Sequence, residues 1–74
     1  MNNYSILEKE NGLCIYNDNL EITVISNSRQ KLYILRDGNL PKVYKSTNNV
    51  YHFIDCLKSF GITDKDILEK IKKF

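Results

Sequence analysis

The sequence predicts an α+β fold, in which an antiparallel β-meander of four to five strands precedes a C-terminal two-helix hairpin packed on one sheet face. Runs rich in β-branched and aromatic residues, separated by Asn, Asp and Gly, occupy the first part of the chain. The remainder carries two apolar stripes at helical spacing, with Gly61 between them. Strands that all precede the helices are typical of this class. A chain of 74 residues accommodates one small domain, residues 1–74.

The first three strands are expected at residues 4–7, 13–16 and 20–26. Asn11 and Gly12 lie between the first two and favour a type I′ hairpin turn, which requires φ > 0 at both positions. The polar run at residues 17–19 predicts the second turn. These segments therefore predict two consecutive antiparallel hairpins.

Two further strands are expected at residues 31–36 and 40–46, after a polar loop at residues 26–30. Asp37 and Gly38 predict a two-residue turn between these strands. Pro41 lies near the start of the last strand. Because proline has no N–H to donate to a neighbouring strand, its position predicts that this strand lies at the edge of the sheet.

Two short helices are expected in the last part of the chain. The first apolar stripe, at positions i, i+3, i+4 and i+7, comprises Val50, Phe53, Ile54 and Leu57. Gly61 suits the position just past a helix end, because glycine adopts φ > 0 without steric cost. Thr63 is expected to cap the second helix, with Asp66 three residues later. Ile62 and Ile67 occupy the positions of a hydrophobic staple. The second stripe comprises Ile67, Leu68, Ile71 and Phe74.

Turn lengths predict which side chains share a face of the sheet. A two-residue turn at residues 37–38 pairs Leu32 with Val43, Ile34 with Pro41, Lys31 with Tyr44 and Tyr33 with Lys42. A five-residue loop at residues 26–30 pairs Val24 with Leu32 and Ile22 with Ile34. The expected apolar face therefore contains Leu32 and Ile34, and the two helices are expected to cover it.

The opposite face is expected to stay open, because two short helices cover only one side of a sheet. The candidate binding residues on this face are Tyr33, Tyr44, Lys31, Lys42, Leu35 and Tyr16, with Thr23 and Ile25 on the same side. An aromatic and basic surface of this kind stacks single-stranded bases or anchors a protein partner. Tyr and Lys are also ordinary cross-strand neighbours on a solvated sheet face, so a purely structural role is an alternative.

No arrangement of residues favours an enzyme, a metal centre or a cofactor. His52 and Cys56 have the i, i+4 spacing of two zinc ligands, but Cys14 is the only other cysteine and the sequence has no second histidine. The same pair lacks an orienting partner for nucleophilic catalysis. All three glycines fall in predicted turns, so no phosphate-binding loop is present. Both cysteines are expected to stay reduced.

Composition narrows the classes of partner and the source. The net charge of +2 is small, and Asp64 and Asp66 at the start of the second helix would repel DNA phosphates, which disfavours a DNA-binding helix-turn-helix. No apolar run reaches the length of a membrane span, and the N-terminus lacks signal-peptide features. A cytoplasmic protein is therefore expected. Ala and Trp are absent while Asn, Lys, Ile and Tyr abound, which indicates an AT-rich genome or mobile element.

One family resemblance involves the segment that follows the central strands. The run Leu32-Tyr33-Ile34-Leu35-Arg36, the turn Asp37-Gly38-Asn39, and Ser46-Thr47-Asn48 before a helix with Phe53-Ile54, Lys58 and Gly61 together resemble part of the small phage anti-CRISPR proteins that inhibit Cas9. The resemblance covers less than half of the chain and rests on hydrophobic spacing and turn residues. Members that mimic DNA are strongly acidic, whereas this chain is slightly basic, so the resemblance implies inhibition without charge mimicry.

The sequence therefore predicts a small non-enzymatic protein-interaction module located in the host cell interior. The leading hypothesis is a phage or mobile-element inhibitor of a host defence complex, such as a CRISPR–Cas effector. Its partner would be a host protein or a ribonucleoprotein complex. The alternative hypothesis is a single-stranded nucleic-acid-binding domain that uses the Tyr/Lys sheet face, and a homodimer that buries this face is a third.

Overall fold

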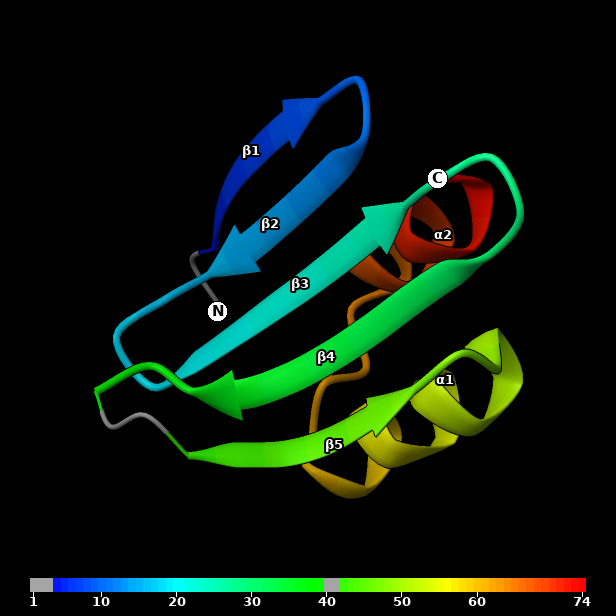
Figure 1. Ribbon diagram of the computed structural model, residues 1–74. Coiled ribbons are helices and arrows are strands. Elements are labelled where there is room, and N and C mark those ends of the chain that lie inside the picture. Colours follow the sequence, from blue (N-terminus) through cyan, green and yellow to red (C-terminus); the bar gives the residue numbers. More distant parts are fainter. Residues whose placement is uncertain (1–3, 40–41) are drawn as a thin grey trace.

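The computed structural model describes residues 4–39 and 42–74, and it contains a five-stranded antiparallel sheet followed by two helices. The strands lie in chain order and are β1 (Ser5–Lys9), β2 (Gly12–Tyr16), β3 (Leu20–Ser26), β4 (Lys31–Asp37) and β5 (Val43–Thr47). The helices are α1 (Val50–Ser59) and α2 (Lys65–Lys73). Both helices lie behind one face of the sheet (Figure 1). The predicted α+β class is therefore confirmed. Within the described ranges, neither helix is long and apolar enough to cross a membrane.

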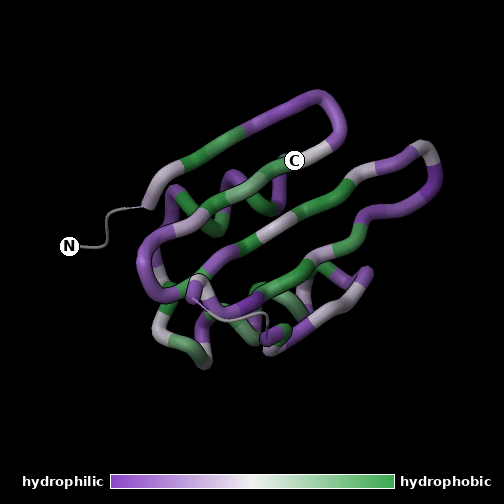
Figure 2. The backbone as a smooth tube through the Cα atoms, turned by 60° about the vertical axis from the view of Figure 1, so that its left-hand side comes forward, coloured by the Kyte–Doolittle hydropathy of each residue, from purple (hydrophilic) through white to green (hydrophobic). Residues whose placement is uncertain are grey.

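The hydrophobic core lies between the two helices and the covered face of the sheet. Hydrophobic stretches of the strands alternate with hydrophilic turns along the chain (Figure 2). Helix α1 packs against β4 and β5. Helix α2 reaches the first strand, where Lys70 Nζ lies 2.7 Å from Glu8 Oε1. The buried residues are Leu13, Ile15, Ile22, Val24, Tyr33, Leu35, Phe53, Ile54, Leu57, Ile62, Ile67, Leu68 and Ile71.

The junction between the helices confirms the predicted role of Gly61. This residue has φ of 85°, and its N–H donates to Lys58 O at 3.0 Å. The N–H of Ile62 donates to Leu57 O at 2.9 Å, so the two bonds form a Schellman motif. The predicted cap at Thr63 is wrong, because Asp64 Oδ1 accepts from the N–H of Asp66 at 2.9 Å. The carboxylate of Asp64, one residue later, caps the helix instead.

The register between β3 and β4 differs from the sequence-based prediction by one residue. Val24 lies opposite Tyr33, and Ile22 lies opposite Leu35. The reason is the loop, which contains residues 27–30 because Ser26 still pairs with Lys31. Asn27 closes this shorter loop by accepting two backbone N–H bonds at its Oδ1 atom, both of 2.9 Å. Since side chains alternate along a strand, the one-residue difference turns every β4 side chain to the other face.

The connection between β4 and β5 is also longer than predicted. It spans residues 38–42, and Leu40 and Pro41, which fall within the predicted fifth strand, lie outside the described residues. Arg36 pairs with Val43 and Leu35 with Lys45, so a β-bulge interrupts the register. The predicted two-residue turn at Asp37 and Gly38 is therefore wrong. The predicted pairs of Leu32 with Val43, Lys31 with Tyr44 and Tyr33 with Lys42 do not form; Val43 pairs with Arg36, and Tyr33 pairs with Thr47.

The first hairpin turns one position earlier than predicted. Lys9 pairs with Gly12, so the two turn residues are Glu10 and Asn11. No non-glycine residue in the described ranges has a positive φ, and neither does Gly12. The predicted type I′ geometry at Asn11 and Gly12 is therefore wrong, although the hairpin itself is present. Gly12 begins β2 as an ordinary extended residue.

Candidate functional site: the open face of the sheet

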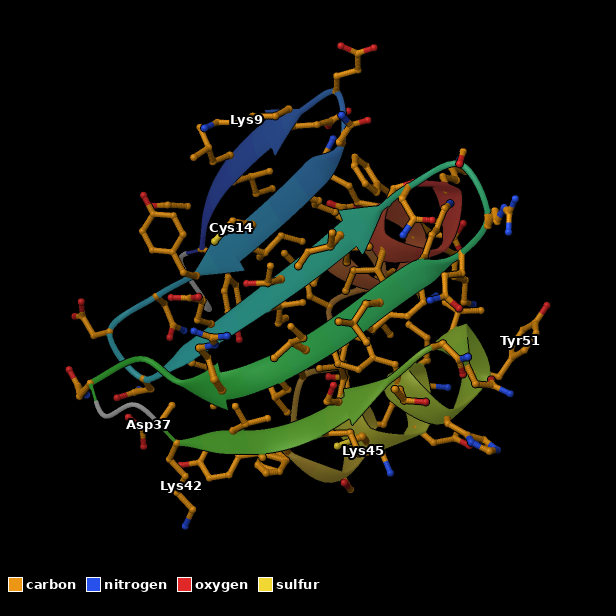
Figure 3. All side chains as sticks on the ribbon, viewed as in Figure 1. Lys9, Cys14, Asp37, Lys42, Lys45 and Tyr51 are labelled. Carbon is orange, nitrogen blue, oxygen red and sulfur yellow. The ribbon has the colours of Figure 1, made fainter. Side chains whose placement is uncertain are left out.

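The face of the sheet turned away from the helices is built from three cross-strand rows, and we call it the open face. The first row is Ser5, Tyr16, Glu21, Arg36 and Val43; the second is Leu7, Cys14, Thr23, Ile34 and Ser46; the third is Lys9, Gly12, Ile25 and Leu32. Residues that pair across antiparallel strands point to the same side, so each row crosses the sheet. The open face is the near side of the sheet in Figure 3, where Cys14 is labelled on β2.

The second and third rows give the open face an aliphatic centre. Leu7 is 52% exposed, Ile25 45% and Leu32 37%, while Ile34 and Cys14 are partly exposed. Ile25 lies directly opposite Leu32, and Leu7 lies opposite Cys14. Contiguous exposed apolar side chains on one surface differ from single scattered ones, which need no explanation, and they make this face a candidate interaction surface. We call these five residues the aliphatic patch.

Charged groups border the aliphatic patch at both ends. In the first row, Arg36 Nε lies 3.8 Å from Glu21 Oε2, and the Thr23 hydroxyl donates to the same carboxylate oxygen at 3.3 Å. In the third row, Lys9 makes no ion pair within the described part of the chain. An ion pair on one side and an unpaired cation on the other form a polar rim, as is common around protein interfaces.

The thiol of Cys14 lies within the patch and is held in its neutral form. Burial raises its pKa above the ordinary value of 9.0, and the nearby Glu21 carboxylate raises the pKa further. A hydrogen bond with Thr23 and the charge of Arg36 oppose this rise. Because the thiolate is the reactive form of cysteine, this environment makes Cys14 an apolar contact residue and a poor nucleophile.

Three of the predicted binding residues do not lie on the open face. Tyr33 is 4% exposed and Leu35 is fully buried, because the β3–β4 register places both against the helices. The ring of Tyr33 lies 5.4 Å from that of Phe53 in the core. Lys31 also points to the helix side, where its Nζ lies 5.9 Å from the centre of the Phe74 ring. The prediction that these residues share an open surface is wrong.

The other three predicted residues are exposed, but they do not form one cluster. Tyr16 lies in the first row, between Ser5 and Glu21. The ring of Tyr44 lies 4.9 Å from that of Phe60 at the end of α1, and its hydroxyl donates to Asp37 Oδ2 at 2.8 Å. Lys42 Nζ lies 5.4 Å from the centre of the Tyr44 ring. Tyr44 and Lys42 thus form a small group at the edge of the sheet, where Figure 3 labels Lys42 beside Asp37.

For the two β4 residues of the aliphatic patch, Leu32 and Ile34, the pattern in the sequence was compatible with either face. Leu32 and Ile34 alternate with Tyr33 and Leu35, so all four positions are apolar and only the register decides which pair is buried. Asn27 carries the signal that could have decided it. An Asn that begins a polar loop favours a tight turn closed by its own side chain, and this turn leaves four loop residues.

The described residues contain no group of three or more His, Cys, Asp or Glu side chains that could hold a metal ion. His52 is exposed at the start of α1, and Cys56 is a free, half-buried thiol. Comparisons of the chain with protein-family models, with curated proteins and with solved structures give no match. Function is therefore inferred from the surface itself.

Proposed function

We propose that this chain is a non-enzymatic protein-interaction module that binds a protein partner through the open face. The observation that supports this proposal is the contiguous aliphatic patch on the uncovered side of a sheet whose other side packs against both helices. Apolar side chains on such a surface lose water when a partner covers them, and this removal of apolar surface from water favours association. A five-stranded sheet is stiff, so little conformational entropy is lost on binding.

The chemistry of the open face favours a protein over a nucleic acid. Single-stranded nucleic acids bind surfaces that offer aromatic rings for stacking and cations for the phosphates. Of the four residues on which the nucleic-acid hypothesis rested, Tyr33 and Lys31 point to the helix side. The other two, Tyr44 and Lys42, lie together at the edge of the sheet. The centre of the open face carries aliphatic side chains, which give an apolar surface to a protein partner but no platform for bases.

The more specific proposal is that the partner belongs to a host defence complex, such as a CRISPR–Cas effector, and that binding inhibits it. This step is supported by the small size, the AT-rich composition and the resemblance to small phage anti-CRISPR proteins. A net charge of +2 argues against DNA mimicry. Inhibition would then follow from apolar contact with a protein subunit, which blocks a working surface or holds one conformation.

A double variant of the open face tests the protein-binding role. Ile25→Lys with Leu32→Glu removes the centre of the aliphatic patch, leaves the net charge unchanged and places opposite charges across a direct strand pair. Ile6→Lys with Tyr51→Glu is the matched control, because both side chains are exposed and lie off the open face. The immobilised wild type, variant and control are each incubated with lysate from a bacterium whose genome is AT-rich, and the retained proteins are identified. In a separate assay, each protein is added to purified Cas effectors and DNA cleavage is measured.

The wild type and the control are expected to retain the same proteins in low and high salt, and the open-face variant is expected to lose them. A weak dependence on salt is expected because apolar contacts are not screened. Retention by the open-face variant would place the interface elsewhere. Binding that falls steeply with salt would instead indicate a nucleic-acid partner, because counterions are released from phosphates. Unchanged cleavage by every effector would contradict the more specific proposal alone.

A further inference from the structure

A hollow in the open face lies over Gly12. It has a volume of about 180 Å³ and is lined by residues of β1, β2 and β3: Leu7, Lys9, Gly12, Leu13, Cys14, Thr23, Val24 and Ile25. Within the third row, Gly12 stands between Lys9 and Ile25. Since glycine has no side chain, the row is interrupted at this position. Leu7, Cys14 and Ile25 then form apolar walls around the gap.

The backbone does not require glycine at position 12. Gly61 needs its positive φ, and a Cβ at Gly38 would meet three backbone atoms of the neighbouring turn at 3.1 Å. Gly12 has neither constraint: its φ is negative, and an added Cβ would meet only Val24 O, at an ordinary contact distance of 3.7 Å. The fold would accept a side chain here. The effect of glycine at this position is therefore to leave the hollow open.

We infer that the hollow is an anchor pocket for one apolar side chain of the protein partner, an aromatic ring above all, with a carboxylate beside it that pairs with Lys9. This inference rests on the protein-binding role proposed above and names the chemistry of the contact. An aliphatic cavity of about 150 Å³ is known to hold a benzene ring. A hollow of about 180 Å³ has room for a phenyl group, and buried aromatic anchors dominate the energies of protein interfaces.

Lys9 determines the charge that the pocket favours. Its aliphatic stem lines the hollow and no acidic side chain of the described residues pairs with it. A lysine buries its stem against apolar surface while its ammonium group stays in water, so the charge lies at the rim. A phenyl group that carries a nearby carboxylate therefore complements both the wall and the rim.

Small molecules that join a phenyl group to a negative, neutral or positive end group test the pocket on the intact chain. The ¹⁵N-labelled protein is titrated with 3-phenylpropionate, 3-phenylpropanol and 3-phenylpropylamine, and amide shifts are followed by NMR. Saturable shifts are expected at Gly12, Cys14 and Ile25 with the carboxylate and the alcohol. The carboxylate is expected to bind about two- to five-fold more tightly than the alcohol, as an exposed ion pair gives, and the amine more weakly. Unsaturable shifts, shifts spread over the surface, or no preference among the three compounds would overturn the inference.

Three variants and one control localise the effect. Gly12→Val fills the hollow and is expected to fold with an unchanged or higher melting temperature while the saturable shifts disappear. Lys9→Glu is expected to reverse the order of the carboxylate and the amine. Ser46→Val adds the same kind of bulk to the open face at its other edge, and it should change nothing. Gly12→Ala fills the hollow in part and provides a milder version of the first variant.

The anchor pocket and the protein-binding role fail in different ways. If the Ile25→Lys, Leu32→Glu variant loses the captured protein but Gly12→Val keeps it, the anchor pocket is overturned and the protein-binding role stands. If the phenyl compounds bind at Gly12 but the wild type retains no protein that resists salt, the protein-binding role is overturned, and with it the assignment of the pocket to a partner's side chain.

Discussion

Two tyrosines that the sequence alone placed on one surface should differ strongly in their effect on stability. Tyr33 is 4% exposed and lies against Phe53, whereas Tyr44 is exposed at the edge of the sheet. Tyr33→Ala removes a buried ring, which costs about 3–5 kcal/mol for large aromatic side chains. A domain of this length has a total stability of about 4–11 kcal/mol. The variant is therefore expected to lose a large share of its stability, and Tyr44→Ala much less.

Thermal and urea unfolding followed by circular dichroism measure this difference. Because each kcal/mol shifts the melting temperature of a domain this small by about 4–8 °C, Tyr33→Ala should melt at least about 12 °C lower than the wild type. Tyr44→Ala loses the contact with Phe60 and the hydrogen bond to Asp37, both at the surface. Equal melting temperatures for the two variants would refute the register and return Tyr33 to the open face.

Two further predictions concern pH and the helix cap. Burial raises the pKa of Cys14 and Tyr33, and the hydrogen bond to Asp37 raises that of Tyr44. A raised pKa means that the folded state holds the proton more tightly than the unfolded state, so the protonated group stabilises the fold. This contribution to the free energy of unfolding is present below the ordinary pKa values of 9.0 and 10.0 and is lost as the pH rises above them. Urea midpoints at pH 7, 9 and 10.5 should fall, and Tyr33→Phe should reduce the fall. Asp64→Ala should cost about 1 kcal/mol and Thr63→Ala almost nothing, which chemical denaturation checks.

The sequence was sufficient to predict the fold class and the helical hairpin, because several local signals there agree. The apolar stripes, the spacing of the two helices and Gly61 each restrict the same segment. The strands lacked such agreement. Apolar residues occupy consecutive positions from Leu32 to Leu35, so either alternating pair fits a core. The choice between them depends on which pair fills the core beside Phe53, and the local signal for it in the sequence is the loop residue Asn27.

The candidate site was affected more than the fold by this ambiguity. A one-residue difference preserves the number, order and direction of the strands, so the architecture is unchanged. The same difference exchanges the two faces of β4, which turns an expected Tyr/Lys surface into an aliphatic one. The hollow over Gly12 was missed for a different reason. The predicted turn already explained why residue 12 is a glycine. The structure removes this explanation, because Gly12 lies in strand β2.

Lengthening the β3–β4 loop by one residue tests whether the loop or the core decides the register. A glycine inserted between Ser28 and Arg29 permits a four-residue loop only if β4 slips, so that Val24 would face Leu32 as the sequence first indicated. We expect no slip, because Leu32 is too small to fill the place of Tyr33 beside Phe53, and the resulting void costs more than the loop gains.

The inserted residue should therefore extend the loop and weaken the two hydrogen bonds accepted by Asn27, a loss of about 1 kcal/mol. Cross-strand nuclear Overhauser effects distinguish the two outcomes, since Thr23 faces Ile34 in the present register. A contact of Val24 with Leu32 in its place would mean that the loop determines the register. Leu32 and Ile34 would then be buried in the variant, and Tyr33 and Leu35 would occupy the open face.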